Sequence, residues 1–370
     1  MKKNKTIFII AGESSGDLHG AGVMGEMKAV DESIVFIGLG GERMAQYGLQ
    51  SLVPIEKLAV MGFWEVVKNI FFFIKLKKII LQKIGEAQPD KIILIDYPGF
   101  NLSIAKNIKQ KFNIPIIYYI SPQLWAWKEK RIETIKKHID KMIVVFPFEK
   151  EWYNKRGVDV EYFGHPVIDT SKQYQYPKQD QEVSINIALC PGSREQEIKR
   201  HMPILRQLIK QYPQGANQRI NFILVRARGL QKDLLTIYVK DLSVTITDES
   251  ILQTFQKSHF GIIASGTATL ESAITTRPLI VVYKMSWISW FITKGFVKIP
   301  FACIVNILAG EKIIPELLQN DFTVENLKKH LDIYIEEKNQ ISYEHKINNI
   351  IKLLGDGDSY KKTAKYILNN

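Results

Sequence analysis

The amino-acid sequence predicts an α/β protein built from two Rossmann-like, doubly wound domains. The chain has 370 residues, more than a single hydrophobic core usually serves. Short β-branched runs alternate with helical patterns, as in right-handed βαβ units around a buried parallel sheet. This alternation occurs twice, on either side of a polar stretch, and apolar residues at 46% can fill both cores.

The expected N-terminal domain covers residues 1–169. Its strands are predicted at the apolar, β-branched runs 6–10, 33–37, 91–95, 114–120 and 141–146. Helical patterns separate these runs, so the strands are expected to lie parallel in one sheet.

The polar stretch TSKQYQYPKQDQE at residues 170–182 has no apolar periodicity and is interpreted as an interdomain linker. A second domain is expected over residues 183–345, followed by a C-terminal helical tail at 346–370. The strands of this domain are predicted at 184–190, 220–225, 243–246, 261–264 and 279–283. Doubly wound folds bind ligands where their strands end, so an interdomain cleft is the predicted site.

Charge and composition narrow the function classes. A formal charge of +12 calls for an anionic partner: nucleic acid, an anionic bilayer or a phosphorylated substrate. Cys190 and Cys303 lie far apart and match no disulfide or metal pattern, which suits a reducing cytosol. No signal-peptide core is found, and no apolar stretch reaches the roughly 18 residues of a membrane span. The protein is therefore expected to stay inside the cell.

The segment MGFWEVVKNIFFFIKLKKIILQKIG at residues 61–85 departs from the strand–helix pattern. On a helix its lysines share an arc of roughly 140°, beside aromatic residues. Periodicity alone fits an interfacial helix and a buried helix with a lysine fringe equally. A second apolar stretch at 285–301 favours the lipid interpretation. The expected lipid contacts are Trp64, Lys68, Phe71, Phe72, Phe73, Lys75 and Lys78.

The first predicted strand runs into the glycine-rich stretch AGESSGDLHG, residues 11–20. Such loops often bind phosphate, because glycine lets backbone amides approach closely. This stretch lacks the lysine of a Walker loop, and Glu13 and Asp17 would repel a phosphate. A structural strand-to-helix turn is the alternative.

Two loops of the second half are better candidates for an anion site. The strand at 184–190 ends in Pro-Gly-Ser193-Arg194 before a helical pattern, which suits a diphosphate. The strand at 261–264 ends before Gly266 and Thr267, whose amides could hold a phosphate, while Glu271 could bind a ribose diol. A surface arginine and a helix cap are the structural alternatives. Together the loops predict a nucleotide diphosphate site.

Asp96 is the candidate reacting group. It ends an apolar strand in LIDYPGFN, where partial burial could raise its pKa and suit it to act as a general base. The alternative is an Asp that holds its own turn. Ser121, Trp125 and Trp127 lie beside basic residues between 128 and 141, a composition that also fits a nucleic-acid surface. No spacing of His, Asp or Glu fits a metal site, so no metal or other cofactor is expected.

Taken in order, these motifs closely resemble those of the lipid-A-disaccharide synthase family, from residue 7 to about 327. The matching segments are AGESSGDLHGAG, LAVMGFWEVV, DYPGFNLSIAK, YYISPQLWAWKEKRI, FPFEKEWYNKRGV, FGHPVID, PGSREQEI, SGTATLESA and VNILAGEKIIPELLQ. The resemblance implies an inverting glycosyltransferase of the GT-B architecture. Its reaction would transfer diacylglucosamine from UDP-2,3-diacylglucosamine to 2,3-diacylglucosamine 1-phosphate, giving UDP and a β-1,6 disaccharide 1-phosphate of lipid A biosynthesis.

The resemblance also implies roles for individual residues. Asp96 would be the general base, and Arg194, Glu271 and Asn306 would belong to the donor site. The first domain would face the acceptor and the membrane, with Glu13, Ser14, Gly16 and Asp17 on the acceptor side of the cleft. The enzyme would be cytoplasmic and peripheral on the inner face of the inner membrane, without metal, cofactor or nucleic acid. Its oligomeric state is left open, with a homo-oligomer as one option.

One departure concerns the expected motif APDFN, because this chain has Tyr97-Pro98-Gly99-Phe100-Asn101 after Asp96. Without a second Asp there, Asp96 alone carries the catalytic prediction. Two alternative functions remain: a UDP-N-acetylglucosamine 2-epimerase of the same architecture, and a non-enzymatic protein that binds nucleic acid or membranes. The amphipathic segment 61–85 disfavours the former, and the paired loops at Arg194 and Gly266 disfavour the latter.

Overall fold

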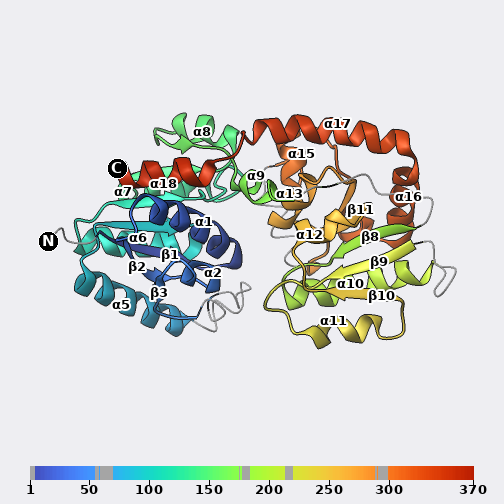
Figure 1. The fold of residues 1–370 in the computed structure, drawn as a ribbon, viewed down its shortest axis with the longest axis horizontal. Coiled ribbons are helices and arrows are strands. Elements are labelled where there is room, and N and C mark those ends of the chain that lie inside the picture. The colour runs from blue at the N-terminus through green and yellow to red at the C-terminus, as the bar shows by residue number, and fades with distance from the viewer. Residues whose placement is uncertain are drawn as a thin grey trace. The chain divides into compact units, whose positions relative to one another are not determined.

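The chain packs into two compact units, each with its own parallel sheet. The computed structural model describes residues 5–54, 58, 70–174, 176, 184–212, 220–287, 290 and 299–370. One unit comprises residues 1–169 and 355–370, and the other comprises residues 170–354. Figure 1 shows the two sheets and their labelled elements.

The first unit has a parallel sheet in the order β3-β2-β1-β4-β5-β6-β7. Its strands are β1 Thr6–Ala11, β2 Val35–Leu39, β3 Leu49–Ser51, β4 Lys91–Ile95, β5 Ile116–Tyr119, β6 Lys141–Val144 and β7 Glu161–Tyr162. Neighbouring strands run parallel, with Ile95 of β4 opposite both Ala11 of β1 and Tyr119 of β5. This order reverses direction between β1 and β4, as in a Rossmann fold.

Helices connect these strands as crossovers. They are α1 Ser14–Val30, α2 Glu42–Ala45, α5 Ile70–Ala87, α6 Pro98–Lys111, η1 Glu129–Arg131, α7 Ile132–His138, α8 Pro147–Asn154 and α9 Pro166–Ser171. Pro98 and Pro147 stand at the first turn of their helices, where a missing amide hydrogen costs nothing. The core lies between sheet and helices and includes the fully buried Phe8, Ile92 and Tyr118.

The second unit repeats the pattern with the order β10-β9-β8-β11-β12-β13. Its strands are β8 Ile185–Cys190, β9 Ile220–Val225, β10 Val244–Thr247, β11 Phe260–Ala264, β12 Leu279–Tyr283 and β13 Glu316–Leu318. Its helices are α10 Glu195–Lys210, α11 Lys232–Val239, α12 Ile251–Gln256, α13 Thr267–Ala273, α15 Ile304–Ala309, η2 Gln319–Asp321, α16 Val324–Ile335 and α17 Glu337–Leu353. A separate buried cluster that includes Leu189, Phe222 and Ile262 forms its core. The prediction of two doubly wound α/β domains is confirmed.

The end of the chain is divided between the units. Residues up to Leu354 pack in the second unit, whereas those from Gly355 pack in the first. Helix α18, Ser359–Asn369, is drawn in red beside the blue α1 in Figure 1 and contacts it. The tail expected at 346–370 is therefore split. Helix α9 ends at Ser171, two residues inside the expected linker.

Helix α5 lies on the surface of the first unit with one face in the core. Leu76, Ile80 and Ile84, four residues apart, are buried, whereas Phe71 is 82% exposed and Ile74 is 48% exposed. Lys75 and Lys78 are exposed, but Phe72 and Phe73 pack partly against the core. Helix α5 thus combines a feature of each interpretation: one face is buried in the core, as in a buried helix, and its first turn exposes apolar side chains, as in an interfacial helix.

Two of the expected lipid contacts, Trp64 and Lys68, lie outside the described residues. Within the part of the chain that is described, we find no helix with the length and apolar character needed to cross a bilayer.

Candidate functional site

The candidate residues lie at the reversal point of each sheet. In the first unit, the loops after β1 and β4 carry Glu13 and Asp96. In the second, the loops after β8 and β11 carry Arg194 and Gly266. Doubly wound sheets bind ligands at this position, where neighbouring crossovers leave in opposite directions. The sequence motifs thus fall where each sheet can accept a ligand.

Asp96 sits on strained backbone. Asp96 and the following Tyr97 have φ angles of 45° and 49°, the left-handed region that non-glycine residues rarely adopt. Two buried side chains hold this turn: Asn101 Nδ2 donates to the Asp96 carbonyl at 2.8 Å, and the Tyr118 hydroxyl donates to the same oxygen at 2.5 Å. Asn101 Nδ2 also donates to the Ile95 carbonyl at 3.1 Å. The backbone at Asp96 is therefore fixed from two sides.

The surroundings of Asp96 suit a general base. Burial, followed by the nearby charge of Glu13, raises the pKa of Asp96 to about 7, while a hydrogen bond from the Tyr97 amide acts in the opposite direction. A carboxyl with a pKa near neutrality can accept a proton from a substrate hydroxyl and release it again. The bond from the Tyr97 amide is the contact expected of an Asp that holds its own turn, so the structural alternative stays open beside the catalytic one.

The first glycine of the AGESSGD loop makes room for Tyr97. A Cβ atom at Gly12 would lie 2.3 Å from the Tyr97 ring, so only glycine fits there. Gly16 faces Ala11 and Ile95 at van der Waals distance, which places α1 against the sheet. This loop therefore supports the turn that carries Asp96. Ser14 is exposed at the first residue of α1, and Glu13 is half-buried beside it.

Asp17 uses its side chain to hold the start of α2. Its Oδ1 accepts from the Gly41 amide at 2.7 Å and the Met44 amide at 3.1 Å, and its Oδ2 accepts from the Arg43 amide at 3.2 Å. Asp17 thereby caps the start of α2, and a carboxylate is favourable at a helix N-terminus. The expected place of Asp17 on the acceptor side stays a prediction.

Glu149 is a second buried carboxyl that the sequence analysis missed. Its Oε1 accepts from the Ser121 hydroxyl and the Trp125 indole, both at 2.9 Å, and its Oε2 accepts from the amides of Val145 and Phe146. Burial raises the pKa of Glu149 to about 7, although all four donors favour the ionised form. The charge of Glu149 also raises the pKa of Asp96, so the two carboxyls influence each other.

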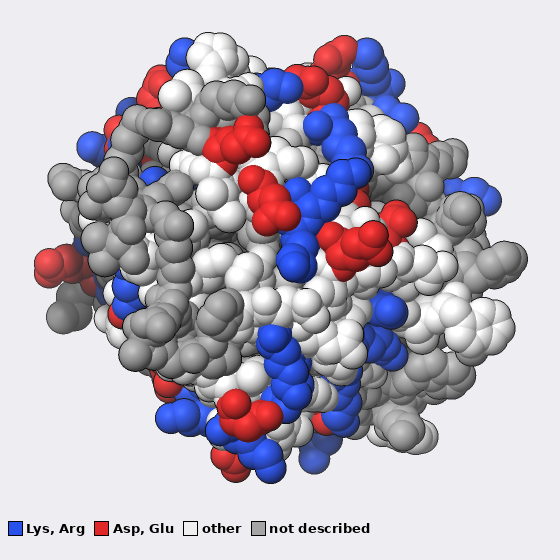
Figure 2. All heavy atoms as spheres, turned by 90° about the vertical axis from the view of Figure 1, so that its right-hand side faces the viewer, with Lys and Arg blue, Asp and Glu red and all other residues white. Residues whose placement is uncertain are grey.

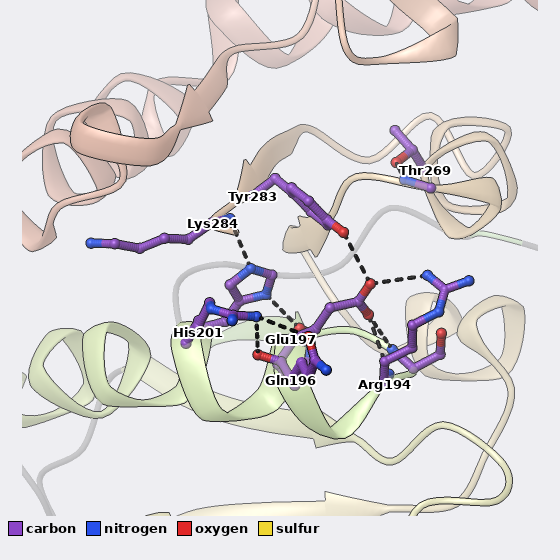
Figure 3. A network of polar contacts seen from close by, with 11 residues as sticks. Arg194, Gln196, Glu197, His201, Thr269, Tyr283 and Lys284 are labelled. Carbon is purple, nitrogen blue, oxygen red and sulfur yellow. Dashed lines mark hydrogen bonds and ion pairs between the residues drawn. The ribbon is translucent and has the colours of Figure 1, made fainter. Parts of the chain in front are cut away.

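In the second unit, a hydrogen-bond network fixes the loop before α10 (Figure 3). Glu197 Oε2 accepts from the amides of Ser193 and Arg194 at 2.9 and 3.2 Å. Its Oε1 accepts from Arg194 Nη1 at 3.1 Å and from the Tyr283 hydroxyl at 3.3 Å. A Cβ at Gly192, whose φ is +126°, would lie 2.4 Å from Glu197 Oε2. Arg194 itself is exposed, so its guanidinium remains accessible to an anion.

His201 joins this loop to β12. Its Nε2 accepts from the Lys284 amide at 2.9 Å, so its Nδ1 carries the hydrogen and donates to the Pro191 carbonyl at 2.6 Å. Burial lowers the pKa of His201, which keeps the ring neutral in this arrangement. The loop that carries Arg194 is thus held at both of its ends.

The loop after β11 agrees only in part with the predicted phosphate contacts. Gly266 and Thr267 are exposed at the start of α13, but the Gly266 amide already donates to Thr269 Oγ1 at 3.3 Å, as in a helix cap. Glu271, on the same helix, is half-buried, and its charge adds to burial in raising the pKa of Cys190 at the end of β8. Glu271 and the loop of Arg194 are therefore near one another.

The buried side chain of Asn306 is hydrogen-bonded within the second unit. Its Nδ2 donates to the Ile314 carbonyl and to Glu316 Oε1, both at 2.8 Å, and its Oδ1 accepts from the amides of Ile313 and Ile314. These contacts use the two hydrogens and both lone pairs of the amide. The side chain of Asn306 therefore supports the 311–316 loop, and its expected place in the donor site stays a prediction.

The face of the molecule drawn in Figure 2 carries both positive and negative side chains. Lys and Arg side chains are interleaved with Asp and Glu on that face, which is the right-hand side of Figure 1. Ion pairs of the second unit include Arg206 with Asp241 at 2.5 Å and Arg226 with Asp248 at 2.6 Å. Among the described residues on this face, acidic side chains interrupt the basic ones, whereas a nucleic-acid backbone favours a continuous basic surface. Among the residues that the structure describes, no group of three or more His, Cys, Asp or Glu could hold a metal ion.

Comparison with known proteins identifies the family. A family model described as lipid-A-disaccharide synthetase matches residues 7–369. The chain belongs to the lipid-A-disaccharide synthase family. Lipid-A-disaccharide synthase 1 of Legionella pneumophila (strain Philadelphia 1) is 36% identical over 361 residues, 95% of this chain and 93% of the relative. The synthase of Trichlorobacter lovleyi is 34% identical over 382 residues, 99% and 97% of the two chains.

Solved structures show that this member of the lipid-A-disaccharide synthase family has the GT-B fold. The calicheamicin glycosyltransferase CalG4 matches with a TM-score of 0.62 and 11% identity, covering 99% of this chain and 98% of the other. The UDP-GlcNAc 2-epimerase of Neisseria meningitidis, bound to UDP-GlcNAc, matches with a TM-score of 0.65 and 14% identity, covering 99% and 100%. At these low sequence identities, the similarity concerns the fold alone. The family match makes the chain a glycosyltransferase, as the sequence motifs predicted.

Proposed function

We propose that the chain transfers 2,3-diacylglucosamine from UDP-2,3-diacylglucosamine to 2,3-diacylglucosamine 1-phosphate. The products are UDP and the β-1,6-linked disaccharide 1-phosphate of lipid A biosynthesis. The observation that carries this proposal is Asp96, a half-buried carboxyl whose pKa is raised to about 7, on strained backbone at the reversal point of a doubly wound sheet. In a glycosyltransferase family, such a group is suited to activate an acceptor hydroxyl.

In the proposed mechanism, Asp96 removes the proton from the 6-hydroxyl of the acceptor. The oxygen then forms a bond to the anomeric carbon of the donor, while the bond from that carbon to the UDP oxygen breaks. Attack opposite the leaving group inverts the anomeric configuration and gives the β-linkage. The proton leaves Asp96 for solvent after the product departs.

We propose that the loops of the second unit hold UDP. Arg194 would neutralise the charge that develops on the leaving diphosphate, because a guanidinium binds phosphate oxygens in a bidentate manner. Ser193, Gly266 and Thr267 would contribute hydrogen bonds at the same edge, and Glu271 would accept from the ribose. The fixed loop before α10 supports this role, since a preorganised cation loses little entropy on binding.

We further propose that the start of α5 docks on an anionic bilayer, at the cytoplasmic face of the inner membrane. Phe71 and Ile74 expose apolar surface next to Lys75 and Lys78, a combination that inserts at the headgroup boundary. Substrates with acyl chains are available at such a surface. A homo-oligomer is compatible with this arrangement.

A product assay tests the proposed reaction. The purified chain is incubated with the two acylated glucosamine substrates in mixed micelles, with and without a chelator, and the products are identified by mass spectrometry. We expect the disaccharide 1-phosphate and UDP in equal amounts, with the same yield when the chelator is present. Conversion of UDP-N-acetylglucosamine to its 2-epimer without any disaccharide would instead support the epimerase alternative.

A further inference from the structure

The loop that follows β5, taken here with η1 as residues 120–131, is anchored at the edge of the sheet where Asp96 lies. Tyr119, the last residue of β5, pairs with Ile95, the last residue of β4, so this loop and Asp96 leave the sheet at the same edge. The Trp125 indole bonds to Glu149, and the Pro122 carbonyl accepts from the Tyr153 hydroxyl at 2.8 Å. The loop is thus anchored on buried partners.

This loop also contains strained backbone. Ile120 has a φ of 64° and Lys128 a φ of 55°. The left-handed region is costly for any residue with a Cβ and most of all for a β-branched one such as Ile120. The anchors from Glu149 and Tyr153 overcome that cost and fix where the end of the loop lies.

At the end of the loop, the described residues supply no acidic partner for the positive charges of Lys128 and Arg131. Among the described residues, no Asp or Glu forms an ion pair with Lys128 or Arg131. The two nearby acids are engaged elsewhere, because Glu129 accepts from Arg156 at 2.7 Å and Glu133 accepts from Lys136 at 3.3 Å. An anion binds favourably between two neighbouring cations that lack a counter-charge, and the described residues supply none for Lys128 and Arg131.

Arg131 also lies within electrostatic reach of the Asp96 turn. Burial and the charge of Asp96 raise the pKa of Tyr118, whereas the charge of Arg131 acts to lower it. The Tyr118 hydroxyl is the group that donates to the Asp96 carbonyl at 2.5 Å. Arg131 is half-buried, and Lys128 is exposed, with its Nζ 4.2 Å from the centre of the Trp127 ring.

We propose that Arg131 and Lys128 form the subsite for the phosphate of the acceptor sugar. This inference rests on the proposed function, and it places the binding site for the acceptor phosphate in the same unit as Asp96. Arg131 would bind two phosphate oxygens and Lys128 would neutralise the remaining charge. The subsite would hold the acceptor by its anomeric phosphate and so orient its 6-hydroxyl toward Asp96. It would select phosphorylated over unphosphorylated acceptors.

The kinetic test compares two acceptors, 2,3-diacylglucosamine 1-phosphate and unphosphorylated 2,3-diacylglucosamine, in identical micelles. In the wild type, we expect a preference for the phosphorylated acceptor. Arg131→Gln should lower kcat/KM for that acceptor roughly 10- to 100-fold, mainly through KM, and change the other little. Arg131→Lys should restore part of the preference, and Lys128→Gln should show a smaller loss.

Controls separate this subsite from general damage and from the proposed function. Lys137→Gln removes an exposed charge at the far end of α7 and should leave the preference intact. UDP affinity should be unchanged in all variants. If the wild type makes disaccharide but Arg131→Gln lowers kcat/KM equally for both acceptors, or for neither, only the subsite proposal fails.

A binding measurement makes the test independent of catalysis. Calorimetric titration with glucosamine 1-phosphate, against glucosamine as control, should show phosphate-dependent binding that Arg131→Gln abolishes. Absence of such binding in the wild type, or its persistence in Arg131→Gln, would overturn the subsite even if the protein proved not to form the disaccharide.

Discussion

At the scale of single residues, the half-buried Asp96 and the buried Glu149 differ in how many hydrogen bonds their carboxyl groups accept. Glu149 accepts four hydrogen bonds and anchors a loop. The carboxyl of Asp96 is held on a strained turn whose backbone oxygen takes the contacts of Asn101 and Tyr118. A group that reacts must keep an oxygen accessible to substrate, whereas a group that supports uses its oxygens on the protein. This distinction supports the proposal that Asp96, and not Glu149, is the general base.

Paired substitutions at Asp96 and Arg194 should separate chemistry from donor binding. Asp96→Asn should lower kcat by roughly a hundredfold or more, the usual cost of losing a general base, with little change in UDP affinity. Arg194→Ala should weaken UDP binding, measured by calorimetry. A kcat near that of the wild type in Asp96→Asn would remove Asp96 from this role.

The pH dependence follows from the raised pKa of Asp96. Because a general base must be unprotonated, kcat/KM should fall as the pH drops below about 7. Stability should change in the opposite sense: the folded state holds a proton that the unfolded state releases above its ordinary pKa of 3.8, so unfolding becomes easier from about pH 4 to 7. Asp96→Asn removes this penalty. Its stability advantage over the wild type, measured by urea unfolding, should therefore grow across that range.

The positions of site residues were predictable only where a motif stands at the end of a strand, and their roles stay proposals. Asp96 and Arg194 follow apolar runs, and that position alone indicates the ligand-binding edge of a sheet. Glu149 stands in the polar stretch EKEW, which is typical of a solvated helix, and its burial depends on the distant Ser121 and Trp125. Likewise, no local sequence pattern reveals that the Asn306 side chain is hydrogen-bonded to the 311–316 loop.

At the scale of elements, the long apolar strands were predictable and the short edge strands were not. Runs such as Lys91–Ile95 and Leu279–Tyr283 have the predicted bounds because burial on both faces selects β-branched residues. The strands β3, β7 and β13 were missed. Each has two or three residues and lies at or beside a sheet edge, so pairing, and not composition, makes it a strand.

Helix α5 offers an element-level test of membrane docking. Phe71→Ser with Ile74→Ser removes exposed apolar surface without touching the core, whereas changes at Phe72 or Phe73 would disturb packing. We expect the double variant to lose co-sedimentation with anionic vesicles while retaining its unfolding midpoint. Ile237→Ser, at an exposed isoleucine of α11, serves as the control. Undiminished sedimentation of the double variant would contradict docking through α5.

At the scale of the whole molecule, the C-terminal helix completes the first unit. Tyr360 of α18 contacts His19 at 2.9 Å, and its ring occupies the space that a Cβ at Gly22 would need. Asp169 Oδ2 accepts from Ser359 Oγ and the Tyr360 amide, and Lys91 Nζ donates to the Ile367 carbonyl at 2.6 Å. The last residues of the chain thus pack on α1, the helix that follows the loop of Glu13.

Loss of these contacts should loosen the first unit selectively. Deletion of residues 355–370, or the milder Tyr360→Ala, should increase amide hydrogen exchange in α1 and lower the unfolding temperature by several degrees. Exchange in α10 of the second unit should stay unchanged. Equal protection of α1 in variant and wild type would show that α18 is dispensable.

The split first unit has a consequence for biosynthesis. Its first 169 residues leave the ribosome early, but their partners on α18 are made only after residue 355. At 5–20 residues per second, this interval lasts roughly 10 to 40 seconds. During that time the surface of α1 that Tyr360 later covers is open to chaperones and proteases. Although the first unit is synthesised first, it is therefore the last to be finished, and a nascent chain that stalls before its end leaves it incomplete.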